Sequence, residues 1–600
     1  MNIETRRAQY DAWNPGLEPE LPREYLRLST MFRSENVSTS VAKAHELSDY
    51  CGLPIYDLVA FRADRLIVHE VLIWVTANIS VPDGMNYEDL GANFRAITST
   101  VHNKYITPNR DLLARVFERF KNDAAAKILQ ELSNLLSPDP NLAVEADNVS
   151  RWSLPFKGKT KKPSVAPIEA AEQREWRIVA EWQDKSETAD NQFDRSCFHA
   201  LSTIATAVLG LRGRLFGDKD LLTELAVTLV CNDYGSEIIG EAIAPLLHNA
   251  ASREGYRRLP EQKSPIIMNI KGAPASGKSS MRPRHKTLAK KLALPWEEFA
   301  LISPDIWRKF LLDYGSLGAA YKYAGTLTGH ELEIIDKKLD QRMAVRAAKG
   351  EMTHLLIDRF RFDSFVPNLE GKGSAKLLTR FGDLVYLFFM ITPPEMTVER
   401  AWMRGLKVGR YKAVEDLLAH NIEAYTGMPE LFFTWALTIG KRVHYEFLDN
   451  SVAEDCPPRT VAFGWNRQMT ILSIKSMLDI DRFRKINIHA QKPEEVYTGD
   501  NLAPNCNVEF LKRCARLIPI INFADYATGQ VYARLEHSNW VWRDKQRFAE
   551  ALVDPDTKVG LEAVAACDHD LTADIGFAAV DLDAAKLHTL GAWGEAAKLG

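Results

Sequence analysis

The spacing of apolar residues predicts that the first part of the chain is helical. Apolar side chains recur three and four positions apart, which places them on one face of a helix, in the segments 25–33, 41–51, 55–79 and 111–136. The same spacing returns from 170 to 251. We therefore expect helices throughout both blocks.

A different pattern begins near residue 262. Short, continuous apolar runs alternate there with longer amphipathic segments, at 265–270, 299–302, 353–357, 384–392 and 444–448. Strands of a parallel sheet that is covered by helices on both faces have this pattern, because both of their faces are buried. Beyond 452, strand-like runs such as RTVAFGW and QVYARL precede an Ala-rich end.

These patterns together predict a multidomain protein with a central α/β domain. Between the two helical blocks the periodicity is lost in a segment rich in Pro and Lys, which is typical of a linker. The expected order is a helical domain over 1–136, a linker over 137–168, a helical domain over 169–261, the central α/β domain over 262–452 and an α+β accessory region over 453–600.

Composition limits the cellular compartments and the classes of binding partner that we expect for this protein. The formal net charge of −4 argues against a general attraction to nucleic acid. Seven cysteines without a C-x-x-C pair are typical of reduced thiols. The most apolar stretch, 66–81, contains His69 and Glu70 and is shorter than the roughly 20 residues of a membrane span. The first residues lack the apolar core of a secretory signal, so we expect a cytoplasmic protein without membrane segments.

The segment GAPASGKS, from Gly272 to Ser279, has the pattern G-x-x-x-x-G-K-[ST] of a phosphate-binding P-loop (Walker A). An apolar run precedes it and a Lys-rich helical segment follows it. Glycine allows backbone angles that point N–H groups at phosphate oxygens, Lys278 reaches the β- and γ-phosphates, and the Ser279 hydroxyl is placed to bind Mg²⁺. We expect ATP to be bound by Gly272, Ala273, Pro274, Ala275, Ser276, Gly277, Lys278, Ser279 and Ser280.

Two acids follow predicted strands. Asp305 lies just beyond the run 299–302, where ligands bind in open α/β sheets. A carboxylate there can accept the proton of a hydroxyl that attacks the γ-phosphate, although Asp305 is also well placed to cap a helix that begins at residue 306. Asp358 ends the third run, in the manner of a Walker B carboxylate that organises Mg²⁺.

Basic residues gather after the fourth run, in ERAWMRGLKVGRYKAVEDLLAHN. Cations along one helix and its following loop can close over a triphosphate and neutralise charge in the transition state. A solvated basic helix face has the same composition. The cations concerned are Arg400, Arg404, Lys407, Arg410 and Lys412.

The order of these motifs resembles the zeta-toxin family of P-loop kinases, and more distantly polynucleotide kinases and chloramphenicol phosphotransferases. The resemblance covers about 265–451 and includes ISPDIWR and HYEFLDNS. It implies that Lys278 and Ser279 bind ATP and Mg²⁺. It also implies that Asp305 is the general base, that Arg404 and Arg410 are catalytic lid cations, and that an acid after the second strand contacts substrate. Our candidates for substrate binding are Glu331 and Arg308.

The function that we expect is an ATP- and Mg²⁺-dependent kinase. The resemblance implies an acceptor hydroxyl on a nucleotide, a nucleotide-sugar or a dinucleotide such as NAD, and an antitoxin-like protein partner is compatible with it. A nucleotide-switched scaffold that binds a protein partner fits the same P-loop, and it would consume ATP without an added acceptor. A polynucleotide end kinase would use Trp540 and Trp542 to stack bases. The segment AACDHD, at 565–570, is more typical of a surface loop than of a metal site.

Overall fold

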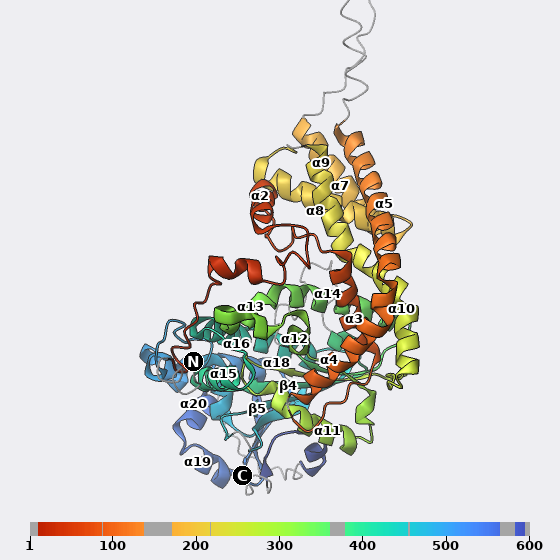
Figure 1. Ribbon diagram of the computed structural model, residues 1–600. Helices are drawn as coiled ribbons and strands as arrows, with labels where there is room; N and C mark the ends of the chain where they lie inside the picture. The colour runs from red at the N-terminus through yellow and green to blue at the C-terminus, as the bar shows by residue number, and fades with distance from the viewer. Residues whose placement is uncertain are drawn as a thin grey trace, which may run out of the picture. The chain divides into compact units, whose positions relative to one another are not determined.

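The computed structural model describes residues 10–86, 88–136, 171–215, 218–359, 378–453, 456–564 and 582–594 (Figure 1). The segments 137–168 and 565–570, which we expect to be a linker and a loop, lie outside these ranges. The chain divides into two compact units. One unit comprises Leu26–Leu72 and Thr100–Ala250, and the other comprises Met1–Tyr25, Ile73–Ser99 and Ala251–Gly600.

The first unit is helical, as its sequence predicts. Its helix α8 shows why: Asn191 caps the amino end by accepting a hydrogen bond from the N–H of Asp194, and Gly213, with φ of 74°, ends the helix in the left-handed conformation. Its helices are α2 (Val41–Cys51), α5 (Arg110–Leu136), α7 (Ala171–Thr188), α8 (Gln192–Arg212), α9 (Lys219–Val230) and most of α10 (Ser236–Arg253).

The amino-terminal region differs from the expected single helical domain. The segment 25–33 contributes only a short 3₁₀-helix, η1 (Arg23–Leu28), and α3 (Ala63–Asn78) begins later than expected. Residues 55–58 form a turn instead, and Phe61 forms an isolated β-bridge with Val37. Residues Ile73–Ser99, which include most of α4 (Asp89–Val101), belong to the second unit. Periodicity shows that a helix has an apolar face, but not which neighbour covers that face.

A sheet of ten strands forms the centre of the second unit, in the order β10-β9-β8-β7-β6-β5-β4-β1-β3-β2. The five strands β5, β4, β1, β3 and β2 are parallel to one another, which confirms a mixed α/β architecture. They are β1 (Ile266–Lys271), β2 (Phe299–Ile302), β3 (His354–Asp358), β4 (Leu384–Ile391) and β5 (Arg442–Asp449).

Strand β4 explains the continuous apolar runs. Its alternate residues Leu387 and Phe389 belong to one buried cluster, whereas Tyr386 and Phe388 belong to another. Successive side chains of a strand point to opposite faces, so both faces of the sheet are covered here. The covering helices include α11 (Arg282–Lys291), α14 (Gly329–Ala348), α15 (Pro394–Val408), α16 (Val414–Ala436), α17 (Ile474–Arg482), α18 (Glu509–Leu517) and α20 (Pro555–Val564).

The expected boundary after residue 452 does not end the sheet. Strand β6 pairs antiparallel with β5, and four further strands continue the same sheet. Their pairing satisfies the outer edge of β5, which an isolated domain would leave open. The added strands are β6 (Arg459–Trp465), β7 (Gln468–Ile471), β8 (Ile520–Ala524), β9 (Val531–Glu536) and β10 (Asn539–Arg543).

Trp540 belongs to this extension and is core, not surface. Only 8% of it is exposed, and its ring lies 5.5 Å from the rings of both Phe523 and Phe548. The expectation that it stacks on bases is therefore wrong, because a buried ring is not accessible to a base. Among the described helices, none is both long and apolar enough to cross a bilayer.

Candidate functional site

The P-loop lies where the strand order of the parallel sheet reverses. Strand β1 is central, with β3 and then β2 on one side and β4 and then β5 on the other. In open α/β sheets, ligands bind at this point, beyond the carboxyl ends of the strands. We call this region of the protein the crevice. The residues from Gly272 to Gly277 enter this crevice directly after β1.

Steric crowding explains both glycines of the P-loop. A Cβ atom on Gly272 would lie 2.7 Å from Ser276 Oγ and 2.8 Å from Met390 Cβ. Gly277 has a φ of 94°, and a Cβ there would lie 2.3 Å from Asn450 Nδ2. A side chain at either position would displace the backbone of the loop.

A short 3₁₀ turn separates the P-loop from the following α-helix, and this arrangement accommodates a proline. A 3₁₀ turn, η6 (Lys278–Met281), follows Gly277, and α11 begins only at Arg282. Pro283 thus occupies the first turn of α11, where the missing backbone N–H has no intrahelical acceptor to lose.

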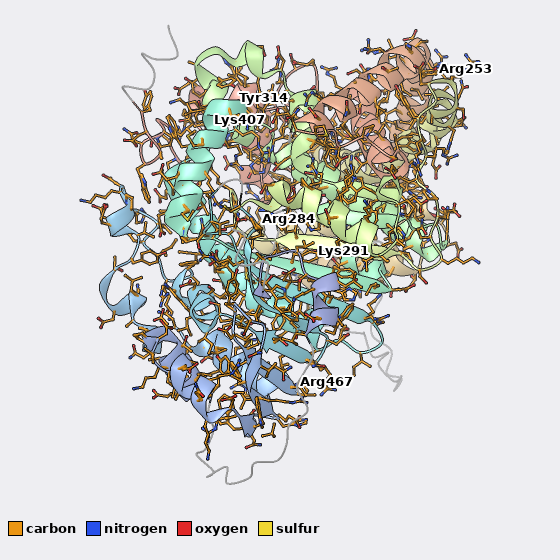
Figure 2. The ribbon with its side chains drawn as sticks, turned by 90° about the horizontal axis from the view of Figure 1, so that it is seen from below. Arg253, Arg284, Lys291, Tyr314, Lys407 and Arg467 are labelled. Carbon is orange, nitrogen blue, oxygen red and sulfur yellow. The ribbon has the colours of Figure 1, made fainter. Side chains whose placement is uncertain are left out.

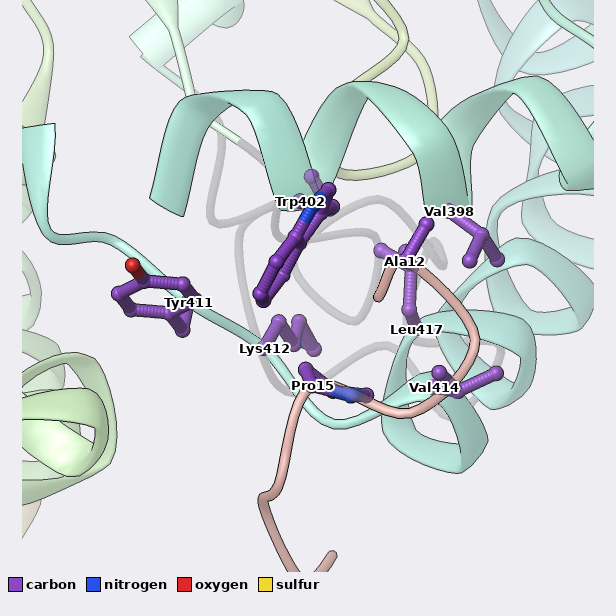
Figure 3. Close-up of a pocket in the computed structure, with 9 residues that line it drawn as sticks. Ala12, Pro15, Val398, Trp402, Tyr411, Lys412, Val414 and Leu417 are labelled. Atoms are coloured by element: carbon purple, nitrogen blue, oxygen red, sulfur yellow. The ribbon is translucent and has the colours of Figure 1, made fainter. Parts of the chain in front are cut away.

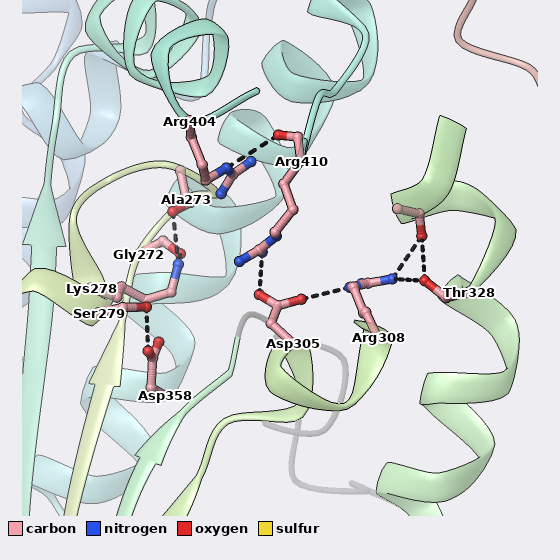
Figure 4. Close-up of polar contacts among 11 residues, drawn as sticks. Gly272, Ala273, Lys278, Ser279, Asp305, Arg308, Thr328, Asp358, Arg404 and Arg410 are labelled. Atoms are coloured by element: carbon pink, nitrogen blue, oxygen red, sulfur yellow. Dashed lines mark hydrogen bonds and ion pairs between the residues drawn. The ribbon is translucent and has the colours of Figure 1, made fainter. Parts of the chain in front are cut away.

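Lys278 and Ser279 point into the crevice (Figure 4). The Nζ atom of Lys278 donates to the carbonyl oxygens of Gly272 at 3.0 Å and Ala273 at 2.8 Å. The Ser279 hydroxyl donates to Asp358 Oδ2 at 2.5 Å. One hydroxyl and one carboxylate are a donor set that suits Mg²⁺, which takes oxygen ligands and keeps several of its waters. Ser279 and Asp358 are thus brought together as the sequence predicts.

Two residues from neighbouring strand ends hold the loop backbone. The Ser276 carbonyl oxygen accepts hydrogen bonds from Thr392 Oγ1 at 3.1 Å and from Asn450 Nδ2 at 2.8 Å. Arg400 in turn donates to the Asn450 carbonyl oxygen at 2.8 Å. Sequence reasoning missed Thr392 as a site residue and assigned Arg400 to the lid. The only signal for Asn450 was its place in HYEFLDNS.

Asp305 lies opposite the P-loop and is held by two arginines (Figure 4). Its Oδ1 atom accepts from Arg308 Nε at 2.9 Å, and its Oδ2 atom accepts from Arg410 Nη2 at 2.5 Å. The helical turn η8 begins at Pro304, with Ser303 at the N-cap position. Asp305 therefore lies inside the turn and is not its cap, so the alternative of a purely capping role is wrong.

Arg308 anchors Asp305 to the protein. Its Nη1 atom donates to the Gly325 carbonyl oxygen and to Thr328 Oγ1, both at 2.7 Å. The guanidinium thus joins α12 (Arg308–Leu311) to α13 (Ala324–Leu327) and to the residue before α14. Substrate binding by Arg308 stays a prediction, and the structure shows the hydrogen bonds by which its guanidinium is held.

The charges of the crevice act on one another. Burial lowers the pKa of Lys278 to about 8, with a further lowering by Arg404 and Arg410 that the carboxylates of Asp358 and Asp305 oppose. Burial alone would raise the pKa of Asp305, but Arg410 and Arg308 outweigh it and hold the pKa well below its ordinary value. At neutral pH, Lys278 is therefore mostly charged and Asp305 is ionised.

The lid cations belong to the end of α15 and the loop after it. The Nε atom of Arg404 donates to the Arg410 carbonyl oxygen at 3.4 Å (Figure 4). Gly409, with φ of 77°, ends α15 and turns the chain. A Cβ on Gly409 would lie 2.1 Å from the Tyr321 hydroxyl, so the glycine also permits a close approach. Arg404 and Arg410 are thus brought toward the P-loop and Asp305.

Glu331 occupies a different environment from the other predicted residues. It lies in the first turn of α14 and is fully buried. The structure therefore does not expose it for a substrate. In the described ranges, no group of three or more His, Cys, Asp or Glu side chains is arranged to hold a metal ion.

The amino-terminal segment closes a seam beside the lid (Figure 3). The lining of the seam is mostly apolar, and its side chains leave no room for a water molecule between them. The polar group in it is Lys412, whose pKa burial lowers to about 8. The lining is Ala12, Pro15, Val398, Ala401, Trp402, Tyr411, Lys412, Val414 and Leu417.

Comparison of the chain with protein-family models, curated proteins and solved structures found no match.

Proposed function

We propose that this protein is an ATP- and Mg²⁺-dependent kinase that phosphorylates a hydroxyl of a small molecule. The observation that carries the proposal is the convergence of Lys278, the Ser279–Asp358 pair and Asp305 at the crevice beyond β1. Arg404 and Arg410 lie within electrostatic range of the same lysine. A P-loop alone supports nucleotide binding, whereas an opposed carboxylate and a pair of cations support phosphoryl transfer.

The donor half of the reaction belongs to the P-loop. The β- and γ-phosphate oxygens of ATP would accept from Lys278 Nζ in place of the Gly272 and Ala273 carbonyl oxygens. Ser279 and Asp358 would hold Mg²⁺, which supplies positive charge to the phosphates when it is bound. Arg404 and Arg410 would add positive charge as the bond to the leaving ADP lengthens.

The acceptor half belongs to Asp305. The acceptor oxygen forms a bond to the γ-phosphorus while the bond from phosphorus to the bridging oxygen breaks, and ADP leaves with that electron pair. The hydroxyl proton passes to Asp305. Since the pKa of Asp305 is strongly lowered, this carboxylate orients the hydroxyl and accepts the proton late, as suits a loose transition state.

The resemblance to zeta toxins favours a nucleotide, a nucleotide-sugar or a dinucleotide as acceptor. It also leaves room for an antitoxin-like partner in the cytoplasm. The burial of Trp540 removes one argument for a polynucleotide acceptor.

The proposal is tested with γ-labelled ATP, Mg²⁺ and a panel of nucleotides, nucleotide-sugars, NAD and oligonucleotides. We expect the wild-type protein to label a small acceptor, and Asp305→Asn to lower transfer at least about 100-fold, the lower end of the usual contribution of a general base. Binding of a fluorescent ATP analogue should be unchanged. The matched control is Asp383→Asn. Asp383 is exposed and lies just before the amino end of β4, whereas Asp305 lies beyond the carboxyl end of β2.

Equal transfer by Asp305→Asn and the wild-type protein would disprove the role of Asp305. ATP consumption that needs no acceptor and labels none would favour the nucleotide-switched scaffold instead. Labelling of oligonucleotides alone would favour the polynucleotide kinase.

A further inference from the structure

Arg359 directly follows the carboxylate that we expect to bind Mg²⁺, and its side chain is buried. Asp358 is the last residue of β3, and Arg359 is the next residue along the chain. Cationic side chains usually lie at the surface, as those of Lys291, Lys407 and Arg467 do (Figure 2). Only 3% of the Arg359 side chain is exposed. A buried charge is costly unless it is paired and hydrogen-bonded, so Arg359 depends on its partners.

Two carboxylates of one helix hold the Arg359 guanidinium. The Nη1 atom donates to Asp336 Oδ1 at 2.7 Å, and the Nη2 atom donates to Asp340 Oδ1 at 2.9 Å and to Asp340 Oδ2 at 3.2 Å. Asp336 and Asp340 lie one turn apart on the same face of α14. A planar guanidinium can bridge two such carboxylates, whereas a lysine ammonium is a single point of charge.

The backbone of Arg359 is held as well. Its carbonyl oxygen accepts a hydrogen bond from Lys271 Nζ at 3.1 Å. Lys271 is fully buried and is the last residue of β1, directly before the P-loop. The residue after Asp358 is thus tied to α14 by its side chain and to β1 by its main chain. These ties restrict the direction in which the Asp358 carboxylate can point.

The same helix also holds the other carboxylate of the crevice. Thr328, at the N-cap position of α14, accepts a hydrogen bond from Arg308, which also donates to Asp305. Asp336 lies about two turns further along the helix. Both Asp305 and Asp358 are therefore connected to one regular element, and functional groups that are supported by a helix are held more precisely than groups on loops.

We propose that Arg359 is a positioning residue for Mg²⁺ binding, because its ion pairs with α14 hold the Asp358 carboxylate in the direction that meets Ser279 and the metal. It acts through Asp358 and contacts neither the metal nor ATP. This inference rests on the metal site of the proposed function. Residues that orient a metal ligand typically contribute about 10- to 100-fold to metal affinity. Mg²⁺ is sensitive to such orientation because it demands a nearly octahedral set of oxygen ligands.

The test measures how Mg²⁺ changes the affinity for a fluorescent ATP analogue. The Kd is determined in EDTA and over a range of Mg²⁺ concentrations, for the wild-type protein and for Arg359→Lys. We expect the half-saturating Mg²⁺ concentration to rise about 10- to 100-fold in the variant, while the Kd in EDTA stays within about twofold. A purely structural defect would loosen the P-loop and raise the Kd in EDTA too, since Lys278 binds the phosphates without the metal.

The matched control is Arg482→Lys. Arg482 is 7% exposed and also pairs with two aspartates, Asp479 and, at 3.7 Å, Asp556. It joins α17 to α20, whereas Arg359 joins the end of β3 to α14. Because sites without shared partners act independently, Arg482→Lys should keep the half-saturating Mg²⁺ concentration within about twofold of the wild-type value.

Asp340→Asn is a milder second variant, which decides the question if Arg359→Lys does not fold. It keeps the ion pair between Arg359 and Asp336, and 19% of the Asp340 side chain is exposed. The half-saturating Mg²⁺ concentration should rise in this variant too, by a smaller factor.

An unchanged half-saturating Mg²⁺ concentration in Asp340→Asn or in folded Arg359→Lys, or an equal rise of the Kd in EDTA, would overturn the inference, while acceptor labelling by the wild-type protein still upheld the kinase. A wild-type protein that needs Mg²⁺ for tight ATP binding but labels no acceptor would overturn the kinase and not the role of Arg359. Wild-type ATP binding and labelling without any dependence on Mg²⁺ would overturn both the metal site and the inference.

Discussion

At the scale of single residues, the crevice works through the balance between burial and charge. Lys278 has lost hydration and lies near two arginines, which together lower its pKa to about 8. Asp305 carries the opposite charge and has its pKa held far below the ordinary value. Between neutral and basic pH, Lys278 therefore loses its proton whereas Asp305 stays ionised.

This balance predicts how ATP binding depends on pH. Lys278 is charged below its pKa and neutral above it, so ATP affinity should fall as pH rises through about 8. Beyond that pH the loss approaches about tenfold per unit, as the charged fraction does. The measurement is the Kd of a fluorescent ATP analogue between pH 6 and 10.

Lys412 provides the control for this titration, because burial lowers its pKa to about 8 as well. It lines the seam beside the lid and is held at 3.1 Å from His420 Nδ1. Lys412→Arg should therefore keep the decline above pH 8. If the decline in ATP affinity disappeared in this variant, the group that titrates would be Lys412 and not Lys278.

At the scale of elements, glycines decide how closely the lid approaches its neighbours. Gly409 ends α15 in the left-handed conformation and lies against the Tyr321 hydroxyl. Gly440, with φ of 85°, has the same backbone requirement, but nothing lies within 4 Å of a Cβ built there. A substitution at Gly440 therefore tests backbone strain alone, whereas a substitution at Gly409 tests strain and steric crowding together.

We expect Gly409→Ala to reduce phosphoryl transfer at least about tenfold, because the shifted chain carries Arg410 away from Asp305. Gly440→Ala should leave transfer unchanged and cost only about 1 kcal/mol of unfolding free energy, the usual cost of a left-handed alanine. Urea denaturation and turnover of the two variants provide the comparison. Equal turnover would show that the lid tolerates displacement.

At the scale of the whole molecule, a buried glutamate of the sheet binds the described carboxyl-terminal segment by hydrogen bonds. Glu446 of β5 accepts from the N–H groups of Leu590 at 2.7 Å and Gly591 at 3.0 Å, and from Thr460 Oγ1 at 2.8 Å. Burial nevertheless raises the pKa of Glu446 to about 7, against these donors and the charge of Lys291. The cost of desolvating the carboxylate exceeds what the hydrogen bonds return.

The raised pKa predicts a loss of stability between mildly acidic and neutral pH. The folded protein binds the Glu446 proton more tightly than the unfolded chain, whose pKa is near 4.5. The unfolding free energy should therefore fall as pH rises from about 4.5 to 7, by at most about 3 kcal/mol. Denaturation at pH 5 and pH 8 measures the difference, which Glu446→Gln should abolish and the exposed control Glu494→Gln should keep. A difference that survives in Glu446→Gln would assign it to another group.

The local elements of this protein could be predicted from its sequence because each signal depends on residues close along the chain. The helical periodicity of 41–51 and the apolar run of 299–302 match α2 and β2 without adjustment. The P-loop pattern and the acids at the strand ends follow the same logic, so Lys278, Asp305 and Asp358 could be named in advance.

Only the tertiary structure decided which distant residues meet. The support of Ser276 by Thr392 and Asn450 and the hydrogen bonds of Arg308 both depend on groups from different elements. The same is true of the sheet, which continues beyond residue 452 because the edge of β5 needs a partner. Strand order and burial are set by the packing of the whole unit, and local patterns do not encode which partner each apolar face or strand edge will find.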